Sequence, residues 1–373
     1  MENQKIEILR SGKIVGDDVK NPFGFYAWPT VAKLKDGTLA AVFSGRRTRH
    51  IDPFGTTMIS YSKDEGKTWT LPAPVIDTPL DDRDGGICVT ENGKVYVTSF
   101  NNSIAQQREW ANWHDRTEAQ TKMYHAYLDM LTEKDEEEYL GFLMAESADG
   151  YTFSEPYKVP VSAPHGPVIL PNGEMLYVGR EFGSSDCTKL GVYKSCDGRN
   201  WERISTIKEG KTANGLEICE PHAIAFESGK IVVLFRKEGK FLDNEAGQEI
   251  TTYQCESFDG GHTFSEPYAV LEGAPPFLFK HSSGTVICAY AYRKKPYTQR
   301  VMFSNDECTT WSKSFEINGD AKFFDLGYHS VAELSDGSII SVYYQTLRTG
   351  QHTNGIYYTI WKFERSEQDD GNC

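Results

Sequence analysis

Short apolar runs recur along the chain in pairs, and each pair is separated by a polar turn that contains a glycine. Six such pairs occur, with the turn glycines Gly37, Gly93, Gly173, Gly229, Gly284 and Gly337. Successive glycines lie 56, 80, 56, 55 and 53 residues apart, so one spacing is longer than the rest. The β-branched residues of the runs and the glycine turns predict β-hairpins. A hairpin repeated with this period predicts a six-bladed β-propeller.

A second repeat occurs five times, and each copy follows a strand-like run. The copies begin at Ser62, Ser147, Ser195, Ser257 and Ser304. Each continues with an aspartate two residues later, a glycine, a hydroxyl or amide residue and an aromatic residue, although the fifth has Cys308 in place of glycine. Aspartate accepts backbone N–H groups, glycine takes a positive φ and the aromatic ring packs on the sheet. This aspartate box is therefore predicted to be a tight structural turn.

The two repeats together predict an all-β chain, with residues 1–373 forming one propeller domain of four-stranded antiparallel blades. The longest spacing contains a segment rich in helix formers, about 104–138, which we expect to be a helical insertion in blade 2. The insertion either packs on the rim of that blade or covers the functional site as a lid. The last blade lacks an aspartate box, and we expect segment 5–14 to supply its outer strand and close the ring. Residues 365–373 are expected to form a polar tail.

Composition excludes several classes of function. The formal net charge is −14 at pH 7, which argues against binding of nucleic acid or an anionic membrane, because both need a basic surface. The first residues contain no apolar segment like that of a secretory signal, so we expect a cytoplasmic protein. The eight cysteines show no zinc-like spacing and are expected to be reduced thiols. Without a nucleotide loop, zinc motif or EF-hand pattern, no cofactor is implied.

Strand direction predicts which residues share a face of the propeller. In an antiparallel blade, the start of the first strand and the end of the second lie on one face, and the glycine and aspartate-box turns lie on the other. Every blade carries ionisable or phenolic residues on the first face, and we expect them to line one shared site. The candidates for substrate binding are Arg47, His50, Asp82, Arg83, His165, Arg180, His222, Arg236, Arg293 and Asp325.

Several candidates also have a purely structural interpretation. The run 82–84 (Asp-Arg-Asp) is either a turn with an internal ion pair or a substrate contact. His165 and His222 adjoin prolines or glycine, as loop histidines with a structural hydrogen bond often do. Arg47 lies in a basic stretch that is either solvated or functional. These alternatives stay open at the level of sequence.

The repeats and the spacing of the charged residues resemble the sialidase (neuraminidase) superfamily over essentially the whole chain. Glu220 lies 16 residues before Arg236, and Arg293 lies 35 residues before Tyr328, as in that family. The resemblance implies a six-bladed propeller in which Tyr328 is the nucleophile and Glu220 is its activating base. It also implies that Asp52 is the general acid/base, and that Arg236 and Arg293 bind a carboxylate.

These roles agree with the chemistry of the side chains. A phenol with a pKa near 10 is a poor nucleophile at neutral pH and needs a carboxylate to take its proton. A tyrosine nucleophile also suits an anionic sugar, because a carboxylate nucleophile would repel the negative charge of the substrate. Arginine binds a planar carboxylate through bidentate hydrogen bonds.

The chain departs from the family at one position. The family has Tyr-Arg-Ile-Pro where this chain has Tyr26-Ala27-Trp28-Pro29, so the first of three arginines is absent. Loss of one bidentate contact costs about 2–4 kcal/mol in carboxylate binding unless another group replaces it. Arg83 and Arg47 are the candidate replacements. Otherwise the substrate is a different sugar.

Three functions follow from these observations. The first is a retaining exo-glycosidase, similar to sialidases, that removes a terminal acidic sugar from a glycan. The second is a polysaccharide lyase, in which an arginine neutralises a uronate and tyrosine or histidine moves the proton. The third is a glycan-binding propeller without activity. The sequence leaves the sugar, the linkage and the oligomeric state open.

Overall fold

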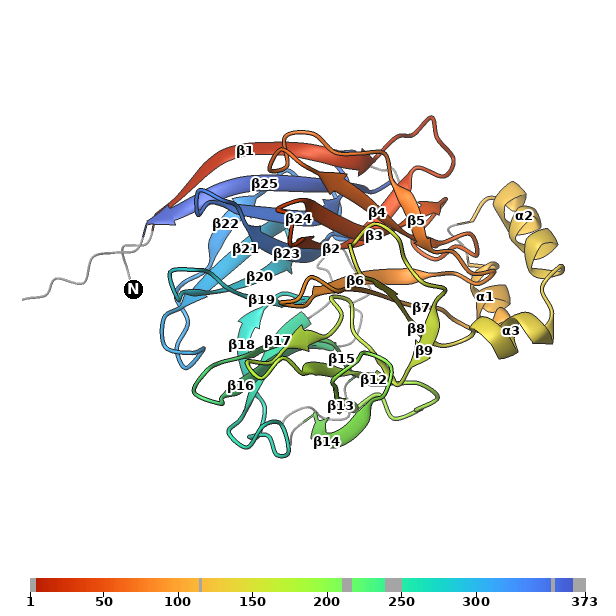
Figure 1. Ribbon diagram of the computed structural model, residues 1–373. Helices are drawn as coiled ribbons and strands as arrows, with labels where there is room; N and C mark the ends of the chain where they lie inside the picture. Colours follow the sequence, from red (N-terminus) through yellow and green to blue (C-terminus); the bar gives the residue numbers. More distant parts are fainter. Residues whose placement is uncertain (1–4, 114–115, 210–216, 239–249, 350–352, 365–373) are drawn as a thin grey trace, which may run out of the picture.

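The computed structural model describes residues 5–113, 116–209, 217–238, 250–349 and 353–364. These residues form six antiparallel sheets arranged around a central axis, as Figure 1 shows. The six-bladed β-propeller predicted from the repeats is therefore confirmed, and so are its four-stranded blades. The sheet of blade 3 has a fifth, two-residue strand because its first strand is interrupted.

The first three blades each contain consecutive strands in hydrogen-bonding order. Blade 1 contains β2 (Phe25–Lys33), β3 (Leu39–Arg47), β4 (Thr56–Ser62) and β5 (Ala73–Ile76). Blade 2 contains β6 (Arg83–Val89), β7 (Val95–Phe100), β8 (Phe142–Ser147) and β9 (Tyr157–Val159). Blade 3 contains β10 (Val161–Ser162), β11 (Val168–Ile169), β12 (Met175–Glu181), β13 (Lys189–Ser195) and β14 (Glu202–Lys208), with both β10 and β11 paired to β12.

Blades 4 and 5 repeat this arrangement, and blade 6 closes the ring. Blade 4 contains β15 (Ile218–Ala225), β16 (Ile231–Glu238), β17 (Ile250–Ser257) and β18 (Tyr268–Glu272). Blade 5 contains β19 (Phe277–Lys280), β20 (Val286–Tyr292), β21 (Thr298–Ser304) and β22 (Phe315–Asn318). Blade 6 contains β23 (Gly327–Glu333), β24 (Ile339–Gln345), β25 (Gly355–Glu364) and, outermost, β1 (Lys5–Gly16).

The two ends of the described chain meet in blade 6. Strand β1 runs antiparallel to β25, from the pair Lys5 and Glu364 to the pair Gly16 and Gly355. In Figure 1 the red β1 lies beside the blue β25. The expected outer strand from the N-terminal segment is confirmed. This closure covers the edge of β25, which would otherwise expose unpaired backbone groups.

Six clusters of buried apolar side chains form most of the hydrophobic core of the described chain, one between each pair of neighbouring blades. Between blades 6 and 1, Phe43 packs in the same buried cluster as Val342. Between blades 3 and 4, Val192 and Phe235 share a cluster in the same way. A fully buried side chain of this size contributes about 1.5–3 kcal/mol. Because each blade buries its two faces only against its neighbours, the ring is expected to fold as a unit.

The aspartate boxes form the predicted tight turns. In the first box, Ser62 Oγ donates to Asp64 Oδ1 at 2.8 Å and accepts from the Gly66 N–H at 2.8 Å. In the fifth box, the Cys308 N–H donates to Ser304 Oγ at 2.9 Å. Cys308 has a φ of +63° and is fully buried, so it adopts the backbone conformation that glycine has in the other boxes. The substituted copy therefore keeps the turn geometry.

The boxes also connect neighbouring blades. Tyr61 Oη donates to the Gly150 carbonyl of the second box at 2.7 Å. Lys230, in the glycine turn of blade 4, donates from Nζ to the Glu307 carbonyl of the fifth box at 2.8 Å. This contact places a glycine turn beside an aspartate box, as expected if both kinds of turn lie on one face. The boxes act as structural contacts between blades.

The helical insertion lies between β7 and β8 and forms a group at the edge of the propeller (Figure 1). It consists of three short helices, α1 (Ile104–Trp110), α2 (Glu118–Leu128) and α3 (Glu133–Tyr139). Tyr124 and Leu128 of α2 pack against Phe54 in a small apolar cluster. Tyr127 Oη donates to the Pro79 carbonyl at 2.8 Å. The insertion is therefore packed onto the loops of blades 1 and 2.

The eight cysteines were expected to be reduced thiols. Seven cysteines are free thiols, and the eighth, Cys373, lies outside the described residues, as does the tail expected at 365–373. Within the described ranges, the helices are too short and too polar to span a bilayer.

Candidate functional site

A cavity of about 790 Å³ lies on the face opposite the aspartate boxes. It is lined by residues at the starts of the first, innermost strands of the blades and at the ends of the second strands. This is the face on which strand direction predicted the site. Seven of the sequence-predicted site residues line it, namely His50, Arg83, Glu220, Arg236, Arg293, Asp325 and Tyr328. Aromatic side chains, including Trp28, Phe100 and Trp113, complete its wall.

Four inner strands carry the same β-bulge where they meet the cavity. In each, two residues face a single residue of the second strand, and the pairs are 28–29, 84–85, 220–221 and 328–329. The first residues of these pairs, with φ between +50° and +56°, are Trp28, Asp84, Glu220 and Tyr328. A left-handed φ costs a non-glycine residue about 1–3 kcal/mol, and such strain gathers at functional sites. All four residues line the cavity.

Tyr328 and Glu220 lie in hydrogen-bond contact inside the cavity. The Tyr328 hydroxyl donates to Glu220 Oε1, and Arg236 Nη1 donates to Glu220 Oε2 at 2.8 Å. Burial opposes ionisation of Glu220, but the charges of Arg236 and Arg293 and the Tyr328 hydrogen bond hold its pKa below the usual value. Burial, with the nearby acids Asp84 and Glu220, raises the pKa of Tyr328 well above 10. The resting pair is therefore a neutral phenol and a carboxylate.

Three arginines reach the cavity from different blades. Arg236 lies in β16 and, besides its contact with Glu220, forms an ion pair with Glu238. Arg293 Nε donates to the Leu326 carbonyl at 2.9 Å, and its Nη2 is buried without a hydrogen-bond partner among the described residues. Such donors are available for an anionic ligand. The third arginine is Arg83.

Arg83 is held by aromatic rings. Its guanidinium carbon lies 4.5 Å from the centroid of the Trp28 ring and 5.5 Å from that of Phe100. The side chain is 9% exposed, and within the described chain its Nε is buried without a partner. Cation–π contact positions the guanidinium without using its hydrogen-bond donors. The Trp28 ring thus positions the Arg83 guanidinium at the cavity wall.

A separate hydrogen-bonded group lines another part of the cavity. Asp325 accepts from the Tyr344 hydroxyl at 2.6 Å and lies 3.0 Å from His50 Nδ1. The His50 ring packs edge-on against Trp28 at 4.9 Å between centroids. Burial would raise the pKa of Asp325, but His50 and the Tyr344 hydrogen bond outweigh it and hold the pKa low. Asp325 is therefore ionised, and its oxygens already form hydrogen bonds with neighbouring side chains.

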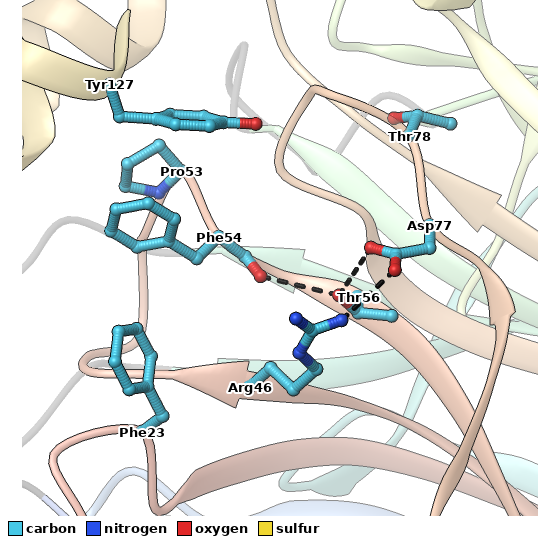
Figure 2. Close-up of a pocket in the computed structure, with 8 residues that line it drawn as sticks. All are labelled: Phe23, Arg46, Pro53, Phe54, Thr56, Asp77, Thr78 and Tyr127. Atoms are coloured by element: carbon cyan, nitrogen blue, oxygen red, sulfur yellow. Dashed lines mark hydrogen bonds and ion pairs between the residues drawn. The ribbon is translucent and has the colours of Figure 1, made fainter.

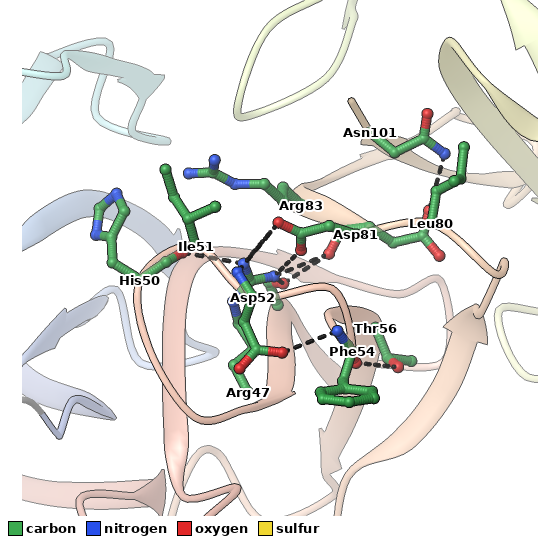
Figure 3. Close-up of polar contacts among 12 residues, drawn as sticks. Arg47, His50, Ile51, Asp52, Phe54, Thr56, Leu80, Asp81, Arg83 and Asn101 are labelled. Atoms are coloured by element: carbon green, nitrogen blue, oxygen red, sulfur yellow. Dashed lines mark hydrogen bonds and ion pairs between the residues drawn. The ribbon is translucent and has the colours of Figure 1, made fainter. Parts of the chain in front are cut away.

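Asp52, expected as the acid/base, is not brought to the cavity. Its carboxylate is fully buried and accepts hydrogen bonds from the Thr48 N–H at 2.7 Å, the Phe54 N–H at 2.8 Å and the Tyr124 hydroxyl at 3.0 Å. Figure 3 shows it turned toward Phe54 and away from the Arg83 guanidinium. Tyr124 belongs to the helical insertion, so the insertion helps to bury the Asp52 carboxylate. The position of Asp52 in the sequence gave no sign that a helix of the insertion would cover it.

Arg47 and Asp82, two further expected contacts, are also buried behind the cavity wall. Arg47 forms a bidentate ion pair with Asp81, with Nη1–Oδ1 at 2.5 Å and Nη2–Oδ2 at 3.0 Å, and both side chains are fully buried. Its guanidinium lies 4.9 Å from the Trp28 ring. Asp82 accepts from the Thr78 N–H at 2.6 Å. The ion pair joins the end of β3 to the loop that leads into β6, and neither Arg47 nor Asp82 lines the cavity.

The remaining three candidates lie outside the cavity wall. His165 Nδ1 is 2.9 Å from Thr30 Oγ1, and His222 Nδ1 accepts from the Leu278 N–H at 3.0 Å. Both imidazoles are buried, and burial lowers the pKa of His222 to about 3. Both are neutral, because burial lowers their pKa, and neither lines the cavity. Arg180 is paired with Glu217 on the surface of blade 3.

Sequence reasoning gave no individual role to three cavity residues that now stand out, Trp28, Asp84 and Glu238, although one interpretation of the run 82–84 made Asp84 a substrate contact. A signal for the first two was present. The inner strands contain Trp28-Pro29, Gly166-Pro167 and Glu220-Pro221 at corresponding places, and Asp84-Gly85 occupies that place in blade 2. Proline after a residue in an inner strand interrupts the ladder and predicts a bulge. Glu238 lies at the end of a strand and carried no such signal.

A second, smaller cavity of about 370 Å³ lies between blade 1 and the insertion. Figure 2 shows Phe23, Phe54 and Tyr127 along one side and the ion pair of Arg46 with Asp77, 3.1 Å apart, on the other. Phe54 and Tyr127, on its aromatic side, also belong to the apolar cluster that packs α2 against blade 1. Across the described ranges, no group of three or more His, Cys, Asp or Glu side chains has the arrangement of a metal site.

Comparison with solved structures relates this architecture to known propellers. A protein of unknown function from Dyadobacter fermentans has a TM-score of 0.75 at 20% identity, covering 96% of this chain and 99% of that one. The intramolecular trans-sialidase from Ruminococcus gnavus has a TM-score of 0.64 at 14% identity, covering 94% and 96%. The NanB sialidase from Streptococcus pneumoniae has a TM-score of 0.64 at 13% identity, covering 94% and 70%. This chain shares its propeller fold with these proteins.

No family model and no curated protein matches the chain. At identities of 13–20%, the structural likeness concerns the fold. The same propeller can carry different chemistry, so the function is argued from the cavity itself.

Proposed function

We propose that this protein is a retaining exo-glycosidase that hydrolyses a terminal acidic sugar from a glycan. The observation that carries the proposal is the Tyr328 hydroxyl hydrogen-bonded to Glu220 in a cavity that Arg83, Arg236 and Arg293 also line. A phenol beside a carboxylate has the arrangement of an activated nucleophile. The arginines supply donors for the carboxylate of the sugar.

The resting protonation states support this role. The raised pKa of Tyr328 keeps the phenol neutral, and the lowered pKa of Glu220 keeps its base ionised. Proton transfer to Glu220 then accompanies attack on the anomeric carbon, so no free phenolate has to form beforehand. The Arg236 pair keeps the Glu220 carboxylate oriented toward the phenol.

The arginine that the family has at position 27 has a candidate substitute in Arg83. Its guanidinium is fixed by Trp28 and Phe100, and its Nε has no partner among the described residues. The Nη2 atom of Arg293 is likewise buried without a hydrogen-bond partner among the described residues. Two such donors on one cavity favour an anionic ligand over a neutral one, despite the overall negative charge of the chain.

A polysaccharide lyase has less support from this cavity. His165 and His222, which would be its candidate proton carriers, are engaged with Thr30 and with the backbone N–H of Leu278. The carboxylate next to Tyr328 also favours nucleophilic attack, because it removes the phenol proton in the same step.

The test is a panel of aryl glycosides that includes sialic acid, uronic acids and their neutral counterparts. We expect release of the phenol from an acidic member, with the first-formed free sugar retaining its anomeric configuration by NMR. Mass spectrometry of a peptide digest after reaction with a slow fluorinated analogue is expected to place the sugar on Tyr328. An unsaturated product that absorbs in the ultraviolet would instead identify a lyase, and inactivity on the whole panel would contradict the proposal.

A further inference from the structure

Four carboxyl groups line the cavity in the described part of the chain, and three of them are occupied by partners. Glu220 and Glu238 each form an ion pair with Arg236. Asp325 is held by side-chain hydrogen bonds with Tyr344, His50 and Asn354. The fourth carboxyl group is Asp84, whose Oδ1 is buried without a hydrogen-bond partner among the described residues.

The backbone presents Asp84 to the cavity. It is the first residue of the bulge in β6, with a φ of +51°, in the same place that Tyr328 and Glu220 occupy in their own blades. Gly85 follows because a Cβ there would lie 2.6 Å from the side chain of Val42 in blade 1. A strained residue with an unpartnered, buried oxygen facing a cavity indicates a functional group.

We propose that Asp84 is the general acid/base of this site, and that Asp52 is a structural residue which holds the insertion. The proposal rests on the glycosidase function proposed above. In the first step the Tyr328 oxygen bonds to the anomeric carbon and its proton passes to Glu220. The glycosidic C–O bond breaks, and the leaving oxygen takes the proton of Asp84.

The second step returns every group to its starting state. Water attacks the anomeric carbon and gives one proton to the Asp84 carboxylate. The bond between the sugar and Tyr328 breaks, and the phenol regains its proton from Glu220. The net reaction is hydrolysis, with one water consumed and the anomeric configuration retained after two inversions.

The surroundings of Asp84 suit a group that must alternate between acid and base. Burial raises its pKa to about 7, against the attraction of the adjacent Arg83 guanidinium. The ionisable groups that act on Asp84 or on which it acts come from four blades, namely Arg83 and Asp81 of blade 2, Glu220 of blade 4, Arg47 of blade 1 and Tyr328 of blade 6. A carboxyl group with a pKa near neutrality is protonated often enough to donate and ionised often enough to accept.

Leaving-group dependence separates an acid/base residue from a structural one. The substrates are the phenyl and 2,4-dinitrophenyl glycosides of whichever acidic sugar, sialic or uronic, the wild-type protein hydrolyses. We expect Asp84→Asn to lower kcat/KM for the phenyl glycoside by about 10²–10⁴-fold, because that leaving group needs a proton. For the dinitrophenyl glycoside, whose leaving group departs as an anion, we expect a loss of less than about tenfold.

Two further measurements address the second step and the pH dependence. Asp84→Gly suits the left-handed φ and leaves space, so azide is expected to raise kcat and to give the glycosyl azide of retained configuration. The wild-type kcat/KM is expected to fall above about pH 7 as Asp84 loses its proton, and Asp84→Asn to lack that limb. Asparagine also tolerates a left-handed φ, so both variants are expected to fold.

Asp52→Asn is the matched control. We expect it to lower the melting temperature, because the buried carboxylate accepts from the Thr48 N–H and the Tyr124 hydroxyl, and to leave the phenyl-to-dinitrophenyl ratio at the wild-type value. If Asp52→Asn shows the selective loss, or Asp84→Asn slows both substrates equally, the assignment of Asp84 is wrong while the glycosidase stands. If the wild type hydrolyses no member of the panel, the glycosidase function fails, and this assignment fails with it.

Discussion

The Tyr328 hydroxyl donates a hydrogen bond to Glu220 Oε1, and each of these residues is the first member of a β-bulge with a left-handed φ. One comes from blade 6 and the other from blade 4, on strands that are not neighbours in any sheet. The contact therefore depends on the closure of the whole ring. It brings a phenol and its base together in a cavity with three arginines.

Replacement of the phenol tests the nucleophile. Tyr328→Phe keeps the ring that packs near Trp28 and Tyr344 but removes the attacking oxygen. We expect kcat to fall by about 10³-fold or more, with the melting temperature close to wild type. Steady-state kinetics on the best aryl glycoside and thermal unfolding followed by circular dichroism measure the two effects.

Tyr343→Phe is the control for that variant. Tyr343 is the buried residue opposite the bulge of β23, and its hydroxyl is 2.7 Å from Thr359 Oγ1, outside the cavity. We expect it to lose about 1 kcal/mol of stability and to keep its activity. Equal kinetic losses in both variants would show that Tyr328 acts through packing.

Two arginines near Trp28 are expected to behave in opposite ways. Arg83→Met removes a guanidinium that lines the cavity, so we expect KM for the acidic substrate to rise by roughly 30- to 1000-fold, equivalent to about 2–4 kcal/mol of lost binding. Arg47→Met leaves Asp81 buried without its ion pair and is expected to cost about 3–5 kcal/mol of folding stability. Kinetics on acidic and neutral glycosides, together with urea unfolding, distinguish the two. A strong loss of stability without a change in KM for Arg83→Met would contradict its assigned role.

The aspartate boxes are expected to affect stability and not catalysis. The Thr68 hydroxyl and N–H donate to Asp64 and lower the pKa of its carboxyl to about 2. Because the folded-state pKa is below the usual 3.8, the stabilisation is present above that value and is lost as the pH falls toward 2. Asp64→Ala should therefore lower the melting temperature at pH 7, by less at pH 3, with kcat/KM unchanged. A similar decrease at both pH values would mean that the hydrogen bonds do not depend on ionisation.

Among its described residues, the insertion contributes one side chain to the cavity, Trp113, which is 43% exposed. We expect Trp113→Ala to raise KM for aryl glycosides several-fold, because its ring forms part of the cavity wall. We expect kcat for the chemical step to stay near wild type, because the ring touches no reacting group. Trp110→Ala is the matched control, since Trp110 packs edge-on against Trp113 at 6.0 Å but does not line the cavity. Kinetics with small and large leaving groups check the difference, and equal effects of both variants would indicate a general loss of helix packing.

The fold was predictable because its signals are local. The glycine turns, the aspartate boxes and the alternation of apolar residues each specify a hairpin or a turn within a few residues, and their period counts the blades. Strand direction then selected the correct face, and seven expected site residues line its cavity. Cys308 kept the turn although it is not glycine, because the serine and aspartate of its box still bind the backbone.

Which acidic and basic side chains face the cavity was decided by tertiary packing. Arg47 ends β3, Asp52 lies in the loop after it, and both belong to the predicted face. Tyr124 and Asp81, which are distant in sequence, bind and bury them. Asp84 received no individual role from the sequence, because its access to the cavity depends on a β-bulge that packs against the neighbouring blade. Short-range turn chemistry and strand patterning specify the propeller, its blades and the face of the site. Only the closed ring decided which carboxyl groups remain without partners, because those partners come from other blades and from the insertion.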